Sequence, residues 1–562
     1  MVTCHHSPLI LKQSSMLQSG ASLVVAVPPI AFILKALTGN VAARRVQLAD
    51  VLRRDPAFVH SRCSQSRSAG SKCLSGSAAL TLGPVAVNLT PTASTERQLD
   101  VQEGAELAKS RKRVFPETHP PGPNSARDPY SYCNTPNGSE QAWEGHSPAD
   151  YRLLSVQVMI RHGDRYPLYT IPKTKRPAID CTLSASRSPS HPLLTSYISH
   201  MGLGGRAKWE APLNSVPRIP NHSSCEVGEL TQTGVVQHLH NGQLLRQAYR
   251  HHSVLPSDWS PHQLGVETTS RSRTVQSGLA FLYGFLPDFD WGRVSVRHQW
   301  STLFCGAACD CPARNRYLEE EQRRQYRLRV ADRELEKTYA DMARTVGVLT
   351  RHLRAANPID SLLCHLCHGL PFPCASAGGG NAGKCLTMEQ FAVIRRQQRD
   401  DDLDRSRVGL YRKYATLAMH PYLNQTATKM ERASREGARR EEVFSLASGH
   451  DITISPLLSA LGLTEASFPR FAARVVFELW RSPKQTKKSS STGERSKGKG
   501  GGLFIRILYN GEDVTFHTAF CRSHDRHAGQ PLCPLENFLS FVRRDMFGIV
   551  NATSYREACY GR

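Results

Sequence analysis

A run of apolar residues leads directly into a short segment rich in charged side chains. Residues 153–160 (LLSVQVMI) are apolar and partly β-branched, which is typical of a buried strand. The next seven residues are RHGDRYP, in which Arg161 and Arg165 flank His162. Guanidinium groups match phosphate oxygens and stay charged at any relevant pH, so both arginines can hold a phosphoryl group that His162 attacks. Their charges also favour the neutral imidazole, which keeps a nucleophile available at mildly acidic pH.

A second reactive pair follows another strand-like segment. Residues 442–448 (EVFSLAS) are expected to form a strand, and Gly449, His450 and Asp451 come directly after it. Ligand sites in open α/β sheets gather at the carboxyl ends of strands, so we expect the two segments to converge on one pocket. There Asp451 can protonate a poor leaving alkoxide, and His450 can donate a hydrogen bond to developing negative charge.

The remaining pattern predicts the elements that position these residues. Helices are expected over residues 231–249, 270–285 (capped by Ser270 or Ser272), 316–356 (broken at Gly347), 388–412 and 453–461. Strands are expected over residues 475–480, 503–509 and 514–516, with a hairpin turn at Asn510-Gly511. This order predicts an α/β fold with an inserted, mainly helical part at about residues 306–440.

Three motifs together resemble those of the histidine acid phosphatases, a family within the phosphoglycerate-mutase-like group. Residues 161–167 fit its RHGxRxP signature, Arg273-Thr274 with Ser277 is similar to its Arg-Thr-x-x-Ser segment, and residues 450–451 are similar to its His-Asp pair. The resemblance implies an α/β sandwich with a smaller helical subdomain, and no metal or other cofactor.

The resemblance also implies a role for each matched residue. His162 becomes the phosphorylated nucleophile and Asp451 the proton donor. The phosphate is held by four side chains: Arg161, Arg165, Arg273 and His450. Arg271 stands two positions before Arg273 and remains an alternative for its role.

Four longer segments resemble one member of this family more closely. They are residues 166–181, 229–245, 281–291 and 468–480. That member is a Golgi enzyme that removes the 2-phosphate from xylose in the linkage region between glycosaminoglycans and proteoglycan cores. The resemblance therefore implies this phosphorylated xylose as substrate, linkage-region glycosyltransferases as candidate partners, the Golgi lumen as location, and no nucleic-acid partner.

Two alternatives to this substrate stay open. The same motifs serve acid phosphatases that act on inositol phosphates or lysophospholipid. The chain could also be a basic glycan-binding protein without turnover, since its 71 Lys and Arg residues exceed its 48 Asp and Glu residues by 23. Such a positive field attracts polyanions.

Part of the positive charge lies in segments that are expected to be flexible. Residues 1–145 are predicted to be a disordered or linker region, residues 146–562 the catalytic domain, and residues 482–502 a flexible basic loop within it. The apolar stretch 21–34 is fourteen residues long and contains Pro28-Pro29, whereas a bilayer span needs roughly 20 residues. It is compatible with an imperfect anchor, a targeting segment or a misassigned start, and the family resemblance implies a single-pass type II anchor with membrane association through the N-terminus.

Cysteines and glycosylation motifs favour the secretory pathway. Sixteen cysteines are more than a cytosolic chain without metal usually carries. Asn-x-Ser/Thr motifs occur at Asn88, Asn137, Asn221, Asn424 and Asn551. From Cys133 onward there are thirteen cysteines, an odd number that leaves at least one unpaired if the others are bridged.

Two cysteine-containing segments also match other motifs. Residues 364–368 (CHLCH) match the c-type haem attachment pattern or could supply zinc ligands, and disulfide pairing is the favoured interpretation. Residues 378–385 (GGGNAGKC) nearly match a phosphate-binding P-loop but end in Cys where Ser or Thr should bind magnesium. Cys374 and Cys385 bracket this segment, which predicts a loop closed by a disulfide. Disulfides are also expected for Cys305, Cys309 and Cys311.

Overall fold

In a computed structural model of the protein, the structure describes thirteen stretches of the chain. They are residues 131–135, 143–146, 148, 150–204, 209–252, 254–255, 258–298, 310–376, 383–435, 442–464, 468–483, 502–523 and 532–561. All of them lie within Gly70–Arg562, which forms one compact unit.

A mixed β-sheet forms the centre of the described part. Its strands are β1 (Arg152–Arg161), β2 (Leu264–Thr268), β3 (Val296–His298), β4 (Phe444–Gly449), β5 (Arg474–Arg481), β6 (Leu503–Tyr509), β7 (Glu512–Asp513) and β8 (Cys533–Pro534). Their order is β3-β2-β4-β1-β5-β6-β7, and β8 pairs with β6. Strands β3, β2, β4 and β1 pair in parallel, whereas β5 to β8 pair antiparallel.

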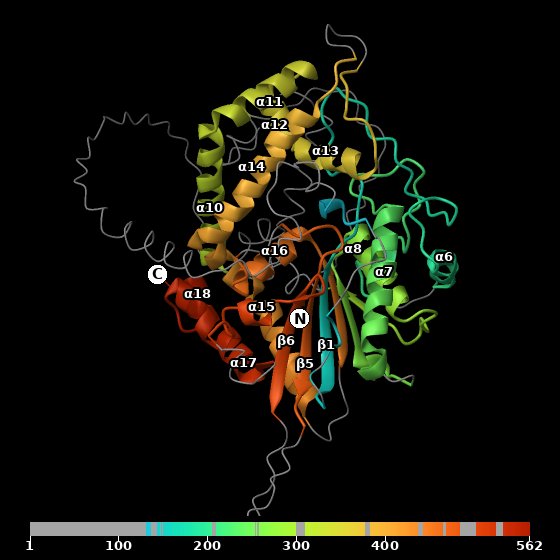
Figure 1. The fold of residues 1–562 in the computed structure, drawn as a ribbon, viewed down its shortest axis with the longest axis vertical. Coiled ribbons are helices and arrows are strands. Elements are labelled where there is room, and N and C mark those ends of the chain that lie inside the picture. The colour runs from blue at the N-terminus through green and yellow to red at the C-terminus, as the bar shows by residue number, and fades with distance from the viewer. Residues whose placement is uncertain are drawn as a thin grey trace, which may run out of the picture. The chain divides into compact units, whose positions relative to one another are not determined.

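Helices cover both faces of this sheet (Figure 1). They are α6 (Leu194–Leu203), α7 (Gln232–Tyr249), α8 (Ser272–Phe285), α10 (Pro312–Ala331), α11 (Arg333–Thr345), α12 (Thr350–Ala355), α13 (Pro358–Cys367), α14 (Met388–Arg407), α15 (Gly409–Ser434), α16 (Asp451–Ala460), α17 (Leu535–Arg543) and α18 (Tyr555–Tyr560). Val158 and Ile160 of β1 pack into the core that α7 and α8 share, and Met159 packs into the core with α15, α16 and α17. Because both faces are covered, β1 is apolar throughout instead of alternating.

The chain between β3 and β4 is largely helical and gathers a third core. Helices α11 to α14 contribute Leu335, Leu353, Leu362 and Phe391 to it. The expected break at Gly347 is present and has a φ of +67°, a conformation that suits glycine. A second break lies at Asp332, whose side chain accepts from the Leu335 amide and starts α11. The predicted long helix is therefore three helices.

The predicted linker boundary at residue 145 is wrong. Tyr132, Cys133 and Glu144 are buried in the body of the protein. Cys133 forms a disulfide with Cys367, and Glu144 pairs with Arg474 at 2.8 Å between Oε1 and Nε, both side chains being almost wholly buried. Residues 131–135 and 143–146 therefore belong to the folded body of the protein. Sequence patterns did not predict that these segments are folded, because each of their contacts joins residues that lie far apart in the chain.

Two local predictions are also corrected. Arg271 is the N-cap residue of α8, and neither Ser270 nor Ser272 caps it. The hairpin turn at Asn510-Gly511 is present, but the strand after it is β7, and the residues after β7 enter a 3-10 helix, Thr515–His517, instead of the expected strand. The Thr515 hydroxyl bonds to the Asp513 carboxylate and to the Ile507 backbone, which favours a turn at this point.

The cysteines form five disulfides among the described residues. The pairs are Cys133–Cys367, Cys181–Cys225, Cys311–Cys559, Cys374–Cys385 and Cys521–Cys533. The predicted Cys374–Cys385 loop is confirmed, as is the disulfide expected for Cys311. For the CHLCH segment, disulfide pairing is confirmed for Cys367 and wrong for Cys364, whose thiol is free and buried. Cys305 and Cys309 lie outside the described residues.

Several expectations concern residues that the structure does not describe. These are the apolar stretch 21–34, most of the basic loop (residues 484–501), Asn88 and Asn137. Asn221, Asn424 and Asn551 are described and exposed. Within the described ranges, none of the helices combines the length and apolarity needed to cross a membrane.

Candidate active site

Parallel pairing of β1 and β4 brings the two sequence motifs together. Arg161 at the end of β1 is the register partner of Gly449 at the end of β4. The His162 amide donates to the Gly449 carbonyl at 3.0 Å. The rings of His162 and His450 lie 5.4 Å apart between centroids, and both residues are buried. The expected convergence of the two strand ends is therefore present.

The hydrogen bonding of His162 identifies its free ring nitrogen. Its Nδ1 lies 2.8 Å from the Gly163 carbonyl oxygen. A carbonyl only accepts, so Nδ1 carries the proton and the Nε2 lone pair is free. Burial, followed by the charges of Arg273 and Arg161, holds the pKa of His162 well below its usual value. The ring is therefore neutral, and its Nε2 can act as a nucleophile.

Close backbone packing and one hydroxyl fix the loop that carries His162. The Gly163 amide donates to the Ser277 hydroxyl of α8 at 3.0 Å. A Cβ on Gly163 would lie 2.5 Å from the Gly234 carbonyl oxygen, and a Cβ on Gly234 would lie 2.3 Å from the Asp164 carbonyl oxygen. Only glycine at both positions allows the loop to rest on the first turn of α7.

Arg161 is enclosed by three aromatic rings. Its guanidinium carbon lies 5.1, 5.5 and 4.5 Å from the ring centroids of Tyr132, Phe468 and Phe471. Its Nη1 donates to the Pro469 carbonyl at 2.5 Å, and its Nη2 donates to the Tyr132 hydroxyl at 2.8 Å. The side chain is fully buried, so its charge acts in surroundings of low polarity, where electrostatic interactions are strong.

Arg165 is oriented by a carboxylate from the helical part of the chain. Its Nη2 and Nη1 donate to the two carboxylate oxygens of Asp360 at 2.8 and 3.3 Å. The second of these oxygens also accepts from the Leu168 amide at 2.6 Å. Asp360 lies in the first turn of α13, so this helix holds the catalytic loop in place.

Arg273 and His450 form the opposite side of the site. The Arg273 Nη2 lies 3.5 Å from Nδ1 of His450, and the His450 Nε2 lies 3.0 Å from the Thr269 hydroxyl. A guanidinium only donates, so His450 accepts at Nδ1 and carries its proton on Nε2. Burial above all, together with Arg165 and Arg271, lowers the pKa of Arg273 to about 9. Burial and Arg273 likewise hold the pKa of His450 well below its usual value. Arg273 therefore lies directly against His450, and the charge of Arg271 also lowers the pKa of His450.

The three arginines leave donors without acceptors. The Nε atoms of Arg161, Arg165 and Arg273 are buried and have no hydrogen-bond partner within the described residues. Unpaired buried donors on like-charged groups are costly. A bound anion with several oxygens would offset the repulsion between the guanidinium groups. The arrangement suits a phosphoryl group.

Asp451 begins α16 and lies beside this cationic cluster. Its Oδ2 is 3.7 Å from Nη2 of Arg161, and its Oδ1 accepts from the Ile452 amide at 3.0 Å. Burial favours the protonated carboxyl group, but Arg161 and Arg165 outweigh it and hold the pKa of Asp451 below its usual value. A dianionic phosphoryl group between them would offset these charges and raise the pKa of Asp451. Substrate binding would thereby prepare Asp451 to carry a proton.

Sequence reasoning missed three residues that support the site from outside the recognised motifs. Tyr132, Asp360 and His368 all contact the RHGDRYP loop, and none was singled out for this role. The Nε2 of His368 lies 2.7 Å from Oδ2 of Asp164, which outweighs burial and raises the pKa of His368. The only sequence signal was the position of His368 in the CHLCH segment, where it was considered as a haem or zinc ligand.

One further cluster of metal-ligand types occurs among the described residues. It contains Cys181, Cys225 and Glu229. The two cysteines are bonded to each other, so neither sulfur is a free thiolate. The Glu229 carboxylate instead accepts from the amides of Asn221 and Glu226. This cluster has the contacts of a structural turn.

Comparison with known proteins gives the family. Residues 152–510, well over half of the chain, match the family model of the histidine phosphatase superfamily (branch 2). The chain belongs to this superfamily. It is 64% identical over 471 residues to 2-phosphoxylose phosphatase 1 of Danio rerio, covering 82% of this chain and 92% of the relative. It is 55% identical over 458 residues to 2-phosphoxylose phosphatase 1 of Homo sapiens, covering 81% of this chain and 91% of the relative.

A more distant likeness is found among solved structures. The multiple inositol polyphosphate phosphatase of Bifidobacterium longum in complex with phosphate is 13% identical, with a TM-score of 0.43, covering 74% of this chain and 95% of that chain. At this distance the match does not bear on the substrate. Family membership confirms the predicted fold class, an α/β sandwich of the histidine phosphatase type, and makes the protein a hydrolase of phosphate monoesters.

Proposed function

We propose that the protein removes the 2-phosphate from xylose in the glycosaminoglycan–protein linkage region, through a phosphohistidine intermediate on His162. The substrate is supported by the similarity to relatives named 2-phosphoxylose phosphatase 1. The chemistry is supported by one observation above all. A neutral His162 with a free Nε2 lies among Arg161, Arg165 and Arg273, whose charges all lower its pKa.

The first step transfers the phosphoryl group to His162. The Nε2 lone pair attacks phosphorus and forms an N–P bond while the bond between phosphorus and the sugar oxygen breaks. Three arginines, Arg161, Arg165 and Arg273, hold the non-bridging oxygens and stabilise their negative charge. Arg165 and Arg161 do so without moving, because Asp360 fixes the first and the aromatic rings fix the second. Asp451 gives its proton to the departing sugar oxygen.

The second step releases phosphate. A water molecule gives its proton to the Asp451 carboxylate and attacks phosphorus, and the N–P bond breaks to restore neutral His162. The low pKa of His162 assists this step, because a weakly basic imidazole is a good leaving group. His450 carries its proton on Nε2 and can donate to the phosphoryl oxygens when it turns from Thr269.

The surroundings of the enzyme follow from the same proposal. Five disulfides are expected of a protein that folds in an oxidising compartment, and three glycosylation motifs are exposed. We place the protein in the secretory pathway, in the Golgi lumen, where its substrate and the linkage-region glycosyltransferases would meet it. The membrane association that the resemblance implies would be through the N-terminal region, which lies outside the described residues.

Phosphate release from a 2-phosphoxylose linkage oligosaccharide, measured in EDTA at mildly acidic pH, tests the proposal. The full chain is expected to release phosphate, and His162→Ala is expected to release none. Loss of activity in EDTA, or an active His162→Ala protein, would contradict the mechanism. Hydrolysis of an aryl phosphate, an inositol phosphate or lysophosphatidate by the parent, with none of the oligosaccharide, would keep the mechanism and reject the substrate.

A further inference from the structure

The peptide unit between Gly163 and Asp164 makes hydrogen bonds on two opposite sides. Its carbonyl oxygen accepts from Nδ1 of His162 at 2.8 Å, and its amide donates to Oε1 of Gln237 at 2.8 Å. A trans peptide is planar, and its C=O and N–H groups point in opposite directions, so a single orientation of the plane makes both bonds. The contact with Gln237 therefore also fixes the carbonyl that receives the His162 proton.

A rotation of this peptide by half a turn would change the chemistry of His162. It would present the Asp164 N–H to Nδ1, and an imidazole nitrogen that accepts from an N–H carries no proton. The proton of the neutral ring would then lie on Nε2, which would have no lone pair to attack phosphorus. Gly163 borders the peptide and has no Cβ, so it resists such a rotation less than other residues would. The loop therefore needs a group that holds the peptide in the productive orientation.

The surroundings of Gln237 determine which end of its amide faces the loop. Gln237 lies on α7, and its Nε2 donates to the backbone carbonyls of Cys133 and Asn134 at 2.7 and 2.9 Å. Carbonyl oxygens only accept, so Nε2 has to face them and Oε1 has to face the Asp164 amide. Gln237 is buried, so water does not compete for these bonds, and Cys133 is fixed by its disulfide with Cys367.

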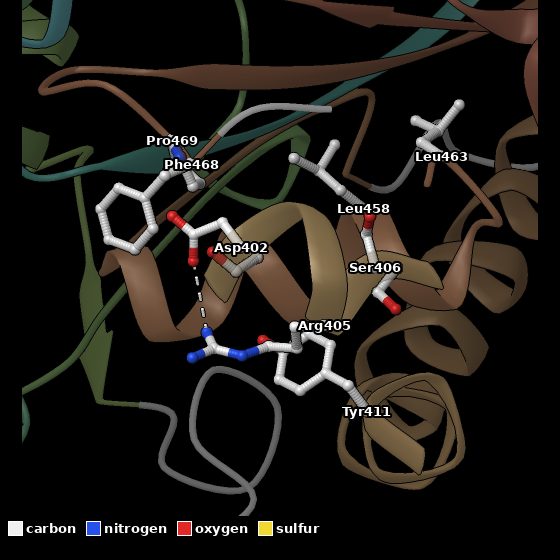
Figure 2. A pocket seen from close by; sticks show the side chains of 10 residues that line it. Asp402, Arg405, Ser406, Tyr411, Leu458, Leu463, Phe468 and Pro469 are labelled. Carbon is white, nitrogen blue, oxygen red and sulfur yellow. Dashed lines mark hydrogen bonds and ion pairs between the residues drawn. The ribbon is translucent and has the colours of Figure 1, made fainter. Parts of the chain in front are cut away.

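The arginines on either side of His162 are held by other contacts. Arg161 is held by Phe468 and Pro469, which also line a pocket (Figure 2): the Pro469 carbonyl accepts from Nη1 of Arg161 at 2.5 Å, and the Phe468 ring packs on the guanidinium. Arg165 is held by its own ion pair. Loss of the Gln237 contact should therefore leave both arginines in place and act on His162.

We propose that Gln237 is a positioning residue that keeps the His162 proton on Nδ1 by holding the Gly163–Asp164 peptide. The inference rests on the proposed role of His162 as nucleophile and adds the group that selects its reactive tautomer. Gln237 acts through the peptide and takes no part in the bond-making steps. The segment at Cys133 acquires a role as well, because it orients the Gln237 amide.

The test replaces Gln237 with Met, which has a similar length and no strong acceptor, in the full chain. The single-turnover rate of p-nitrophenol release from p-nitrophenyl phosphate, with enzyme in excess, measures the attack by His162. This rate is expected to fall about 10²–10³-fold, since a wrongly placed proton on a catalytic histidine can cost about 10⁴ in rate. The inhibition constant of inorganic phosphate, which measures binding by the arginines, should stay at the parental value.

Gln232→Met is the matched control. Gln232 lies on the same helix, is also buried, and has the same pattern of contacts. Its Nε2 donates to the carbonyls of Arg187 and Pro189 at 2.6 and 2.9 Å, and its Oε1 accepts from the Ser184 amide at 2.8 Å. These partners belong to residues 184–189 and not to the catalytic loop. The control should therefore lose similar stability and keep both kinetic constants.

Gln237→Glu separates the two ends of the amide. A carboxyl group keeps an acceptor for the Asp164 amide but offers at most one donor to the carbonyls of Cys133 and Asn134. This variant should therefore have a lower Tm than the parent and still keep most of the single-turnover rate. A merely structural role would make the rate follow Tm in both Gln237 variants.

The tautomer itself can be read from ¹⁵N spectra of protein labelled at histidine, in which the His162 signals are those missing from His162→Ala. The parent and Gln237→Glu should carry the proton on Nδ1, and Gln237→Met should carry a large share of it on Nε2. A Gln237→Met protein with the parental rate or the parental tautomer would overturn the inference, as would an equal loss of rate in Gln232→Met or Gln237→Glu. An active His162→Ala protein would instead overturn the proposed mechanism, and the role of Gln237 would fail with it.

Discussion

Replacing Asp360 with Asn tests whether the helical part of the chain positions the catalytic loop. Asp360 receives two hydrogen bonds from Arg165 and one from the Leu168 amide. The side chains of Arg165 and Asp360 are only 7% and 14% exposed, so the pair is shielded from solvent. Removing one partner of a buried ion pair costs about 3–5 kcal/mol, because the other charge is left uncompensated. Asn keeps one acceptor oxygen, so we expect a loss of about 3 kcal/mol.

This loss converts into a shift in melting temperature. Unfolding entropy is about 2.1 cal/mol/K per residue, which for the 363 described residues is about 0.8 kcal/mol/K. A loss of about 3 kcal/mol therefore lowers Tm by about 4 °C. Arg165 also loses its fixed orientation, so kcat/KM for any phosphate monoester should fall at least tenfold, since a displacement of about 1 Å can cost a hundredfold.

Calorimetry on the parent and the variant measures the shift in Tm, and steady-state kinetics on the same preparations measures the loss in kcat/KM. Asp341→Asn is the control, because Asp341 and Arg344 form an exposed pair at the same 2.8 Å distance, with side chains 37% and 74% exposed. Exposed pairs contribute about 0–1 kcal/mol, so this variant should shift Tm by no more than about 1 °C. An Asp360→Asn protein with parental Tm and parental kcat/KM would show that α13 does not position the loop.

Three further outcomes are expected. Asp451→Asn should lower kcat about 10²–10⁴-fold on alkyl phosphates and far less on aryl phosphates, because a phenolate leaves without help from an acid. Equal losses of kcat on both substrates would refute the assignment of Asp451 as proton donor. Asp402→Asn should raise Tm above neutral pH and leave it unchanged near pH 4. Burial raises the pKa of Asp402 from 3.8 to about 6, so the charged carboxylate destabilises the folded state as pH rises through that interval. A pH-independent difference in Tm would show that the buried charge of Asp402 is not the reason for the effect. The pKa of His368 is raised in the folded state, so its pair with Asp164 stabilises the protein fully below the unfolded pKa of 6.5 and loses this effect as pH rises through the folded pKa. His368→Gln should therefore lower Tm more at about pH 5.5 than at about pH 8.5. The reverse order in a melting series would reject the ion pair.

The sequence by itself determined the local features of the site and the class of the fold. The apolar run before Arg161 predicted β1, and the run before Gly449 predicted β4, because both strands are covered on two faces and need apolar side chains at nearly every position. Their shared direction in an α/β sheet was enough to predict that His162 and His450 meet. The helical spacing of residues 231–249 likewise predicted α7, which Thr231 caps as its side chain accepts from the Gly234 amide.

Only the tertiary structure decided what surrounds these residues. The hydrogen bond from Arg165 joins residues 195 positions apart, and that from Arg161 to Pro469 joins residues 308 positions apart. No periodicity or motif encodes such distances, since they depend on how the helical part packs on the sheet. The same reason hid the ordered segment at Tyr132 and the pairing of Cys133 with Cys367. Local spacing identifies which groups can do chemistry, whereas packing between distant segments sets their charge, orientation and surroundings.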